Sequence, residues 1–350
     1  STLAVGGVIT IANGSYAAPA IAFASDTDTG IARSGTNSIG IVAGGVNKFY
    51  SDANSTLVTV SAGTSNLTLG VNAGNSITSG GNYNTVVGDA AGTSITTGDY
   101  NVALGYNAGG SVTTGINNTL VGGLSGDAIT TGQYNTLYGY RSGTAITDAE
   151  YNVGLGGDAL FTNTTGDNNT AVGQAALYSN TTASNNTAVG RSALVANTTG
   201  TNNTALGAEA LDANTTANNN TAIGKVALGG NTTGASNTAL GSGALFANTT
   251  ASNNTAVGTN SLAVNTTGHS LVAVGASALD ANTTGRYNTS VGYTSLGQNT
   301  TGEFNSALGE SALAVNTTGS ANTAQGAGAL DSNTTASNNT AIGRSALAAN

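Results

Sequence analysis

The chain has 350 residues, of which 7% are charged and 5% aromatic, with 52 glycines, one proline and no cysteine, methionine or tryptophan. A net charge of −9 with only seven Lys and Arg residues excludes a basic nucleic-acid-binding surface, and no apolar run approaches the length of a membrane-spanning helix. Because no disulfide framework is possible, stability must come from backbone hydrogen bonds and packing.

Residues 1–65 lack the periodicity of the rest of the chain, and we expect them to form a small β module. Two runs, residues 7–11 and 38–42, alternate in the manner typical of short strands. Asp26, Asp28 and Gly30 resemble the beginning of a calcium-binding loop, but the downstream bidentate glutamate is missing. The sequence therefore predicts a polar turn there, and no metal site.

From residue 66 onward the sequence is periodic, with a glycine every 17 residues through 16 positions and no insertion or deletion. Most of these glycines close a phrase similar to Asn-Thr-Ala-Val-Gly, as at residues 186–190. A strict period over more than 250 residues means that each repeat is one structural unit stacked on the next. The glycines are Gly88, Gly105, Gly122, Gly139, Gly156, Gly173, Gly190, Gly207, Gly224, Gly241, Gly258, Gly275, Gly292, Gly309, Gly326 and Gly343.

Each repeat is numbered here from this glycine as position 0. A unit of 17 residues is too short for a helical hairpin repeat, which needs about 33, but it suits one coil of a β-solenoid. Thr-Ala-Val predicts a strand, the glycine predicts a corner with positive φ, and Asn-Thr-Thr-Gly predicts another corner. Ala-Leu at positions +3 and +4 is expected to begin a second short strand. The predicted fold is therefore an all-β, parallel β-solenoid (a β-roll).

The coils fall into two types. Position +4 is Gly in the four coils within residues 66–150 and Leu in the twelve coils within residues 151–350, where position +7 becomes Asn from Asn163 onward. Stacked coils align equivalent residues, so Asn at positions −4 and +7 should form hydrogen-bonded ladders along the axis. The ladder residues predicted at position −4 include Asn84, Asn101, Asn118, Asn169, Asn186, Asn203 and Asn254.

The charged residues keep the same register. Of the 18 charged side chains between residues 84 and 350, 17 fall at positions +1, +2, +5 or +11. Charged side chains avoid a packed core, so these positions are predicted to be corners of the coil that face solvent.

The strand is predicted to be covered on both faces. Alternation places positions −1 and −3 on one face and the small Ala at −2 on the other. We assign the −1 and −3 side chains to the inside of the coil and expect the Ala face to meet another chain. Gln325, at an otherwise apolar −1 position, would then form a polar layer with partners across an axis. The rod is therefore expected to associate with other chains.

No catalytic or cofactor site is predicted. His269 is the only histidine and there is no cysteine, so neither a zinc site nor a Ser-His-Asp arrangement can form within one chain. The acidic residues are scattered over the corners instead of being paired as in a glycosidase. Adjacent Thr residues point to opposite faces, which leaves no double Thr rank for ice binding.

An aromatic column at position −5 includes Tyr83, Tyr100, Tyr134 and Tyr151. Stacked rings that cover the edge of the coil explain this column, and contact with a glycan is the alternative.

The phrase Asn-Thr-Ala-Val-Gly-x-x-Ala-Leu resembles the head repeats of trimeric autotransporter adhesins, and its Asn-Thr-Thr-Gly version is still more similar to repeats of bacteriophage tail-fibre proteins. Residues 19–31 also resemble a stretch of phage tail fibres. The resemblance implies a homotrimeric fibre, intertwined or side by side, whose N-terminal module is also trimeric. It further implies a structural, non-enzymatic shaft on the virion that extends a host-recognition tip. Its partners would be two further copies, other virion proteins and a host-surface receptor such as a glycan.

The resemblance leaves a bacterial cell-surface trimeric adhesin, which binds host or matrix ligands outside the cell, as the alternative. Because the chain starts at Ser1 and stops within a repeat, we expect it to be a segment of a longer protein.

Overall fold

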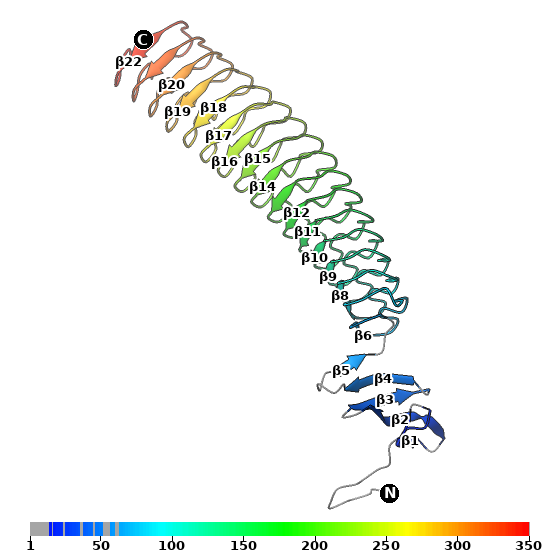
Figure 1. Ribbon diagram of the computed structural model, residues 1–350. Coiled ribbons are helices and arrows are strands. Elements are labelled where there is room, and N and C mark those ends of the chain that lie inside the picture. The colour runs from blue at the N-terminus through cyan, green and yellow to red at the C-terminus, as the bar shows by residue number, and fades with distance from the viewer. Residues whose placement is uncertain are drawn as a thin grey trace, which may run out of the picture.

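The computed structural model describes residues 14–15, 17–23, 25–35, 38–44, 46–51, 57–59 and 63–349, and these contain strands and turns but no helix. Five strands near the N-terminus form an antiparallel sheet, and 17 three-residue strands follow in a parallel stack (Figure 1). The predicted all-β, parallel solenoid is therefore confirmed.

The N-terminal sheet consists of β1 (Ile21–Phe23), β2 (Asp26–Gly35), β3 (Ser38–Ala43), β4 (Val46–Ser51) and β5 (Leu57–Thr59), paired in chain order. The strand predicted at residues 38–42 is β3, whereas residues 7–11 lie outside the described residues. The turn predicted for residues 26–30 is wrong, because these residues begin β2 and pair with β1 through Ala22 and Gly30. Their backbone hydrogen bonds are thus made in a sheet.

The solenoid strands pair in parallel, and each residue lies beside its equivalent in the next coil, as Ala188 does beside Ala205. The first strand of the stack lies within the predicted solenoid, but its coil was not among the 16 identified, because its corner glycine, Gly70, precedes Gly88 by 18 residues instead of 17. The strands are β6 (Leu67–Leu69), β7 (Thr85–Val87), β8 (Val102–Leu104), β9 (Thr119–Val121), β10 (Thr136–Tyr138), β11 (Val153–Leu155), β12 (Thr170–Val172), β13 (Thr187–Val189), β14 (Thr204–Leu206), β15 (Thr221–Ile223), β16 (Thr238–Leu240), β17 (Thr255–Val257), β18 (Val272–Val274), β19 (Thr289–Val291), β20 (Ser306–Leu308), β21 (Thr323–Gln325) and β22 (Thr340–Ile342).

Each described coil has one strand, so the second strand predicted at Ala-Leu is wrong. In the coil of Gly190, Ser192 and Leu194 both have left-handed φ angles, 57° and 52°, which break the extended backbone into turns. These turns still bind the next coil, since the N–H of Leu194 donates to the carbonyl of Ala210 at 3.0 Å. The wall opposite the strand is therefore held by hydrogen bonds between coils without being a sheet.

The two faces of the strand are the reverse of those predicted. Ala188, at position −2, is completely buried, whereas Thr187 and Val189 on either side of it are exposed and partly exposed. The interior is narrow, and the buried Leu194 from the opposite wall fills it, so only a small side chain fits on the strand side. Gln325 therefore lies on the exposed outer face and not in the coil.

The two coil types fill the same core from different positions. In the coil of Gly88, Gly92 has a left-handed φ of 52° and the buried Ile95 at +7 supplies the apolar volume. A Cβ on Gly92 would lie 2.8 Å from Cδ1 of Ile95, so both positions cannot carry a large side chain. In the later coil of Gly190, Leu194 supplies this volume from +4. Position +7 therefore no longer needs an apolar residue and is occupied by Asn197.

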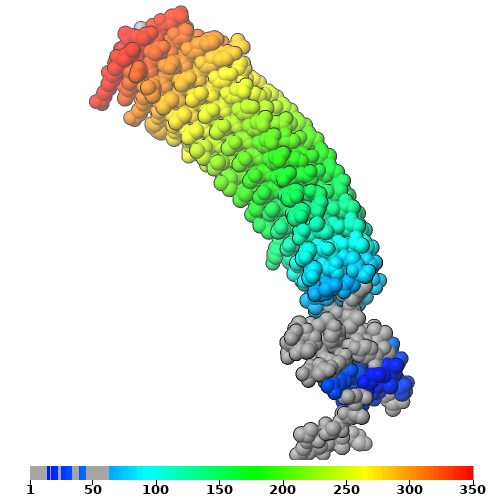
Figure 2. Space-filling view, viewed as in Figure 1, coloured from blue at the N-terminus to red at the C-terminus, as the bar shows by residue number. Residues whose placement is uncertain are grey.

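The stacked coils form an uninterrupted curved rod (Figures 1 and 2). The 17 strands give 16 spacings of about 4.8 Å, or a length of roughly 77 Å. The described part of the chain has no helix that is long and apolar enough to cross a membrane.

Candidate functional site

The corner glycines hold adjacent coils in close contact. Gly190 has a φ of 139°, a backbone angle that residues with a side chain rarely adopt. A Cβ at this position would lie 2.4 Å from the carbonyl oxygen of Gly207. The spacing of the coils therefore depends on glycine at this position for two reasons at once. The same geometry holds for Gly88, Gly105, Gly122, Gly173, Gly190 and Gly207, with φ between 127° and 142°.

The asparagines at position −4 form a ladder inside the rod. The Oδ1 atom of Asn169 accepts the backbone N–H of Asn186 at 3.0 Å, and Nδ2 of Asn186 donates to the carbonyl of Gly200 at 2.9 Å. All of these side chains are completely buried, so they bind neighbouring coils and are closed to outside ligands. The residues placed in this way are Asn84, Asn101, Asn118, Asn169, Asn186, Asn203 and Asn254.

Two further ladders run parallel to the first. At position +7, Nδ2 of Asn180 donates to Oδ1 of Asn163 at 2.7 Å. At position +8, the hydroxyl of Thr181 donates to the carbonyl of Thr198 at 3.1 Å. The Thr ladder was not predicted, although a Thr at +8 in every coil from Gly88 to Gly326 was a visible signal.

The position −4 ladder is interrupted once. The N–H of Leu271 donates to Oδ1 of Asn254 at 3.0 Å, but Leu271 has no side-chain oxygen to accept the N–H of Asn288 in the next coil. Nearby, the ring of His269 meets Tyr287 edge-on, with centroids 5.1 Å apart. Within the described residues, no three His, Cys, Asp or Glu side chains are grouped to hold a metal ion.

The exposed aromatic column consists of stacked pairs. The ring centroids of Tyr83 and Tyr100 are 4.9 Å apart and those of Tyr134 and Tyr151 are 5.0 Å apart, with nearly parallel planes. Each ring covers one face of its partner, so only the outer face of each pair and the hydroxyl groups remain open. A sugar could therefore stack only at the ends of a pair.

The charged side chains lie on solvated corners, and several of them pair between coils. Arg141 binds Asp158 at 2.8 Å, Arg286 binds Glu303 at 2.9 Å, and Arg191 is paired with Glu209. Between residues 84 and 349, no charged side chain is buried. The predicted assignment of positions +1, +2, +5 and +11 to the solvent side agrees with this exposure.

Asp26 and Asp28 lie two residues apart on β2, where Asp26 is exposed and Asp28 is partly exposed. The hydrogen bond between the two carboxyl groups lowers the pKa of Asp26 and raises the pKa of Asp28. This pair can share a proton at acidic pH, and two carboxyl groups are far fewer than the roughly six to eight oxygen ligands that calcium takes.

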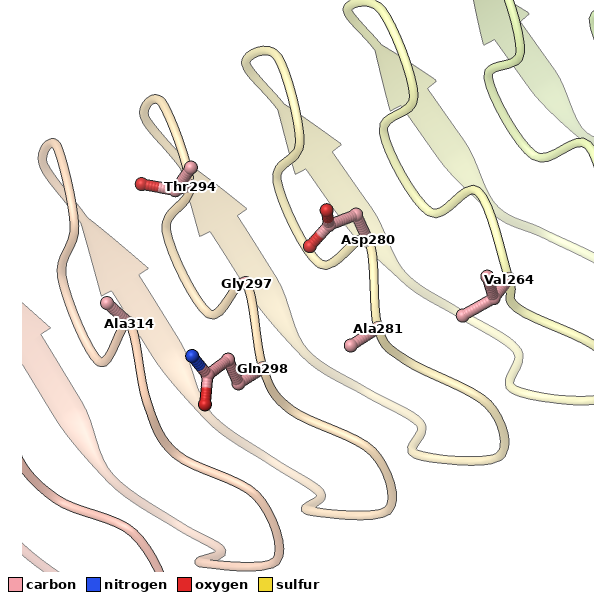
Figure 3. A pocket seen from close by; sticks show the side chains of 7 residues that line it. All are labelled: Val264, Asp280, Ala281, Thr294, Gly297, Gln298 and Ala314. Carbon is pink, nitrogen blue, oxygen red and sulfur yellow. The ribbon is translucent and has the colours of Figure 1, made fainter.

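One shallow groove lies on the side of the rod opposite the strands (Figure 3). Its volume is about 660 Å³, and burial raises the pKa of the carboxyl group of Asp280, its only charged lining residue. A single carboxylate beside Gln298 can bind polar ligands but lacks the second carboxylate that glycoside hydrolysis needs. The groove is lined by Val264, Asp280, Ala281, Thr294, Gly297, Gln298 and Ala314.

The outward face of the strands carries a row of mostly apolar side chains, which we call the apolar stripe. It consists of position −1 in β6 to β22, and each member is Val, Leu or Ile except Tyr138 and Gln325. Leu206 is 46% exposed and Leu308 is 47% exposed. Single exposed apolar residues are common on protein surfaces, but a row of this length in which all members except Tyr138 and Gln325 are Val, Leu or Ile is typical of an interaction surface.

Comparison with models of known protein families gave no match, and a comparison with curated proteins gave none. The functional argument therefore rests on the surfaces of the rod itself. Of these, the apolar stripe is the one that follows the solenoid along its full described length.

Proposed function

We propose that the chain is the shaft of a trimeric bacteriophage tail fibre, which extends a host-recognition tip and takes part in attachment to the host cell. The observation that supports this proposal most directly is the uniform stack of 17 parallel strands in one register. Coils that are bound to each other by backbone and side-chain ladders make the chain long and stiff. They do not concentrate reactive side chains at one place. A rod of roughly 77 Å suits a spacer between a virion and a receptor.

The proposed trimer is supported by the exposed apolar stripe. A single coil buries only small or medium-sized side chains such as Ala188 and Leu194, and it leaves Val189 partly open to water. Burying a Val or Leu side chain completely contributes about 1.5–3 kcal/mol, so association of the stripes would add stability in every coil.

The alternative function, a bacterial cell-surface adhesin that binds host or matrix ligands along its length, is supported by different features. The stacked Tyr83–Tyr100 and Tyr134–Tyr151 pairs and the groove beside Asp280 are open on the rod. These features suit weak contacts with polar ligands that are repeated along a fibre.

Two measurements test the proposal. Sedimentation equilibrium of the purified chain should give three times the chain mass of 33.7 kDa, and a monodisperse monomer would contradict the trimer. Antibodies against the chain should label tail fibres of intact virions and block adsorption to host cells. Labelling of a bacterial surface instead would favour the adhesin.

A further inference from the structure

We infer that three copies of the chain pack in parallel and in register through the outer face of β6 to β22, with the apolar stripe facing a common axis. This inference rests on the trimer proposed above and names its contact surface. It also assigns a role to Tyr138 and Gln325, the two members of the stripe that are not Val, Leu or Ile. We assign to them the role of fixing the register of the copies.

The stripe differs from the charged corners of the rod in having no charged residue in any coil. From residue 85 to residue 343, no charged residue occupies position −3, −2, −1 or 0, whereas charges recur at +1, +2, +5 and +11. Position −3, beside the stripe, is Thr in most coils, as at Thr187. The outer face of the strands is thus uncharged over its whole length, which is typical of the core of an interface.

A second copy of the chain is the partner that fits this surface. The members of the stripe repeat with the spacing of adjacent strands, about 4.8 Å, and a partner must repeat at the same spacing to keep contact over 17 coils. A parallel copy of the chain has strands at the same spacing, so it meets this requirement. A stripe of roughly 77 Å by about 10 Å offers on the order of 800 Å² per chain, which in a trimer is shared between two neighbouring copies.

The two exceptions would be mismatched by any slip between copies. A slip of one coil would place the amide of Gln325 against Leu308 or Ile342, where its hydrogen-bonding groups have no partner. In register, the three amides lie in one layer and can bind each other, as a single polar layer does in a coiled coil. The same slip would place the ring of Tyr138, which is 59% exposed, against the smaller Val121.

The natural absence of cysteine makes disulfide cross-linking a direct test. A single cysteine can cross-link to its counterpart only where the two Cβ atoms approach within about 3.5–4.5 Å. Val121→Cys and Val257→Cys, which lie in distant coils, should therefore each give a covalent dimer after oxidation of the full chain. Thr199→Cys is the matched control, because Thr199 is exposed at position +9, away from the strand. Cross-linking at both Val positions also excludes antiparallel pairing.

The outcomes separate this inference from the proposed function. A trimer by sedimentation without cross-links at the Val positions, or with equal cross-linking at Thr199→Cys, would overturn the inferred interface and leave the trimeric shaft standing. A monomer by sedimentation would overturn the proposed trimer itself.

A second pair of substitutions tests the register. Tyr138→Leu with Gln325→Leu should keep the trimer mass but lower the Val257→Cys cross-link by about twofold or more, because several registers then share the population. An unchanged yield would show that these two residues do not fix the register.

Discussion

Replacing a corner glycine with alanine should disrupt one coil-to-coil contact, and the adjacent Gly156 and Gly157 offer a matched pair for this test. Gly156 has a φ of 139°, and a Cβ on it would lie 2.6 Å from the carbonyl oxygen of Gly173. The nearest atom to a Cβ on Gly157 is the carbonyl oxygen of Tyr140 at 3.9 Å, which is an ordinary contact. The two substitutions thus add the same methyl group one residue apart.

The expected cost of Gly156→Ala has two parts. A non-glycine residue in a disfavoured backbone conformation costs on the order of 1–3 kcal/mol. Moving the added Cβ from 2.6 Å to an ordinary contact of 3.4 Å would open the coils by about 0.8 Å. The hydrogen bond from the N–H of Gly173 to Leu155, at 2.7 Å, would then be stretched and largely lost, which costs about 1 kcal/mol. The sum is about 2–4 kcal/mol for Gly156→Ala, against at most about 0.5 kcal/mol for Gly157→Ala.

Hydrogen exchange followed by mass spectrometry measures this effect locally. In a solenoid each repeat contacts only its neighbours, so exchange in peptides covering residues 153–175 should accelerate at least about tenfold in Gly156→Ala. Distant coils should keep the exchange rates of the unaltered chain. Equal exchange in the two variants would refute the close contact of corner glycines as the determinant of coil spacing.

Three further outcomes follow from the ladders and the partly buried carboxylates. Leu271→Asn should provide an acceptor for the N–H of Asn288 and raise stability by about 1 kcal/mol in thermal unfolding; a lower melting temperature would contradict the interrupted ladder. Asn186→Ala removes the Oδ1 acceptor of the N–H of Asn203 and should cost about 1–3 kcal/mol in urea unfolding, and no loss would contradict the ladder's role. Burial raises the pKa of Asp212, so the native state binds more protons than the unfolded state and stability falls as pH rises above the ordinary value of 3.8. Asp212→Asn should reduce this fall in melts between pH 3 and pH 7, and an unchanged profile would refute it.

The asparagine ladders are a feature of the site that the sequence predicts correctly. Asn186 and Asn180 recur at fixed positions, and stacking places identical residues side by side, so their hydrogen bonds could be predicted without coordinates. The groove beside Asp280 could not be predicted in this way. It arises where the small Gly297 and Ala314 leave space between larger side chains of neighbouring coils, which depends on the positions of four coils at once.

The prediction of a second strand was wrong because Leu194 has a left-handed φ instead of an extended backbone. Leu194 is an ordinary residue for a strand or a helix, and nothing in its type indicates a left-handed φ. The first five coils, which carry Gly at the same position, as at Gly92, did contain that signal, because glycine takes this conformation without strain.

The sequence by itself determined the period, the corners and the ladders, because a strict repeat fixes which residues lie beside each other. It also determined that Thr187 and Val189 share one face of the strand and Ala188 takes the other. Only the tertiary structure decided which face is inside, because alternation is the same from either side. The left-handed turn at Leu194 directs its side chain into the narrow interior, so the small Ala188 faces inward and the apolar stripe is left on the surface.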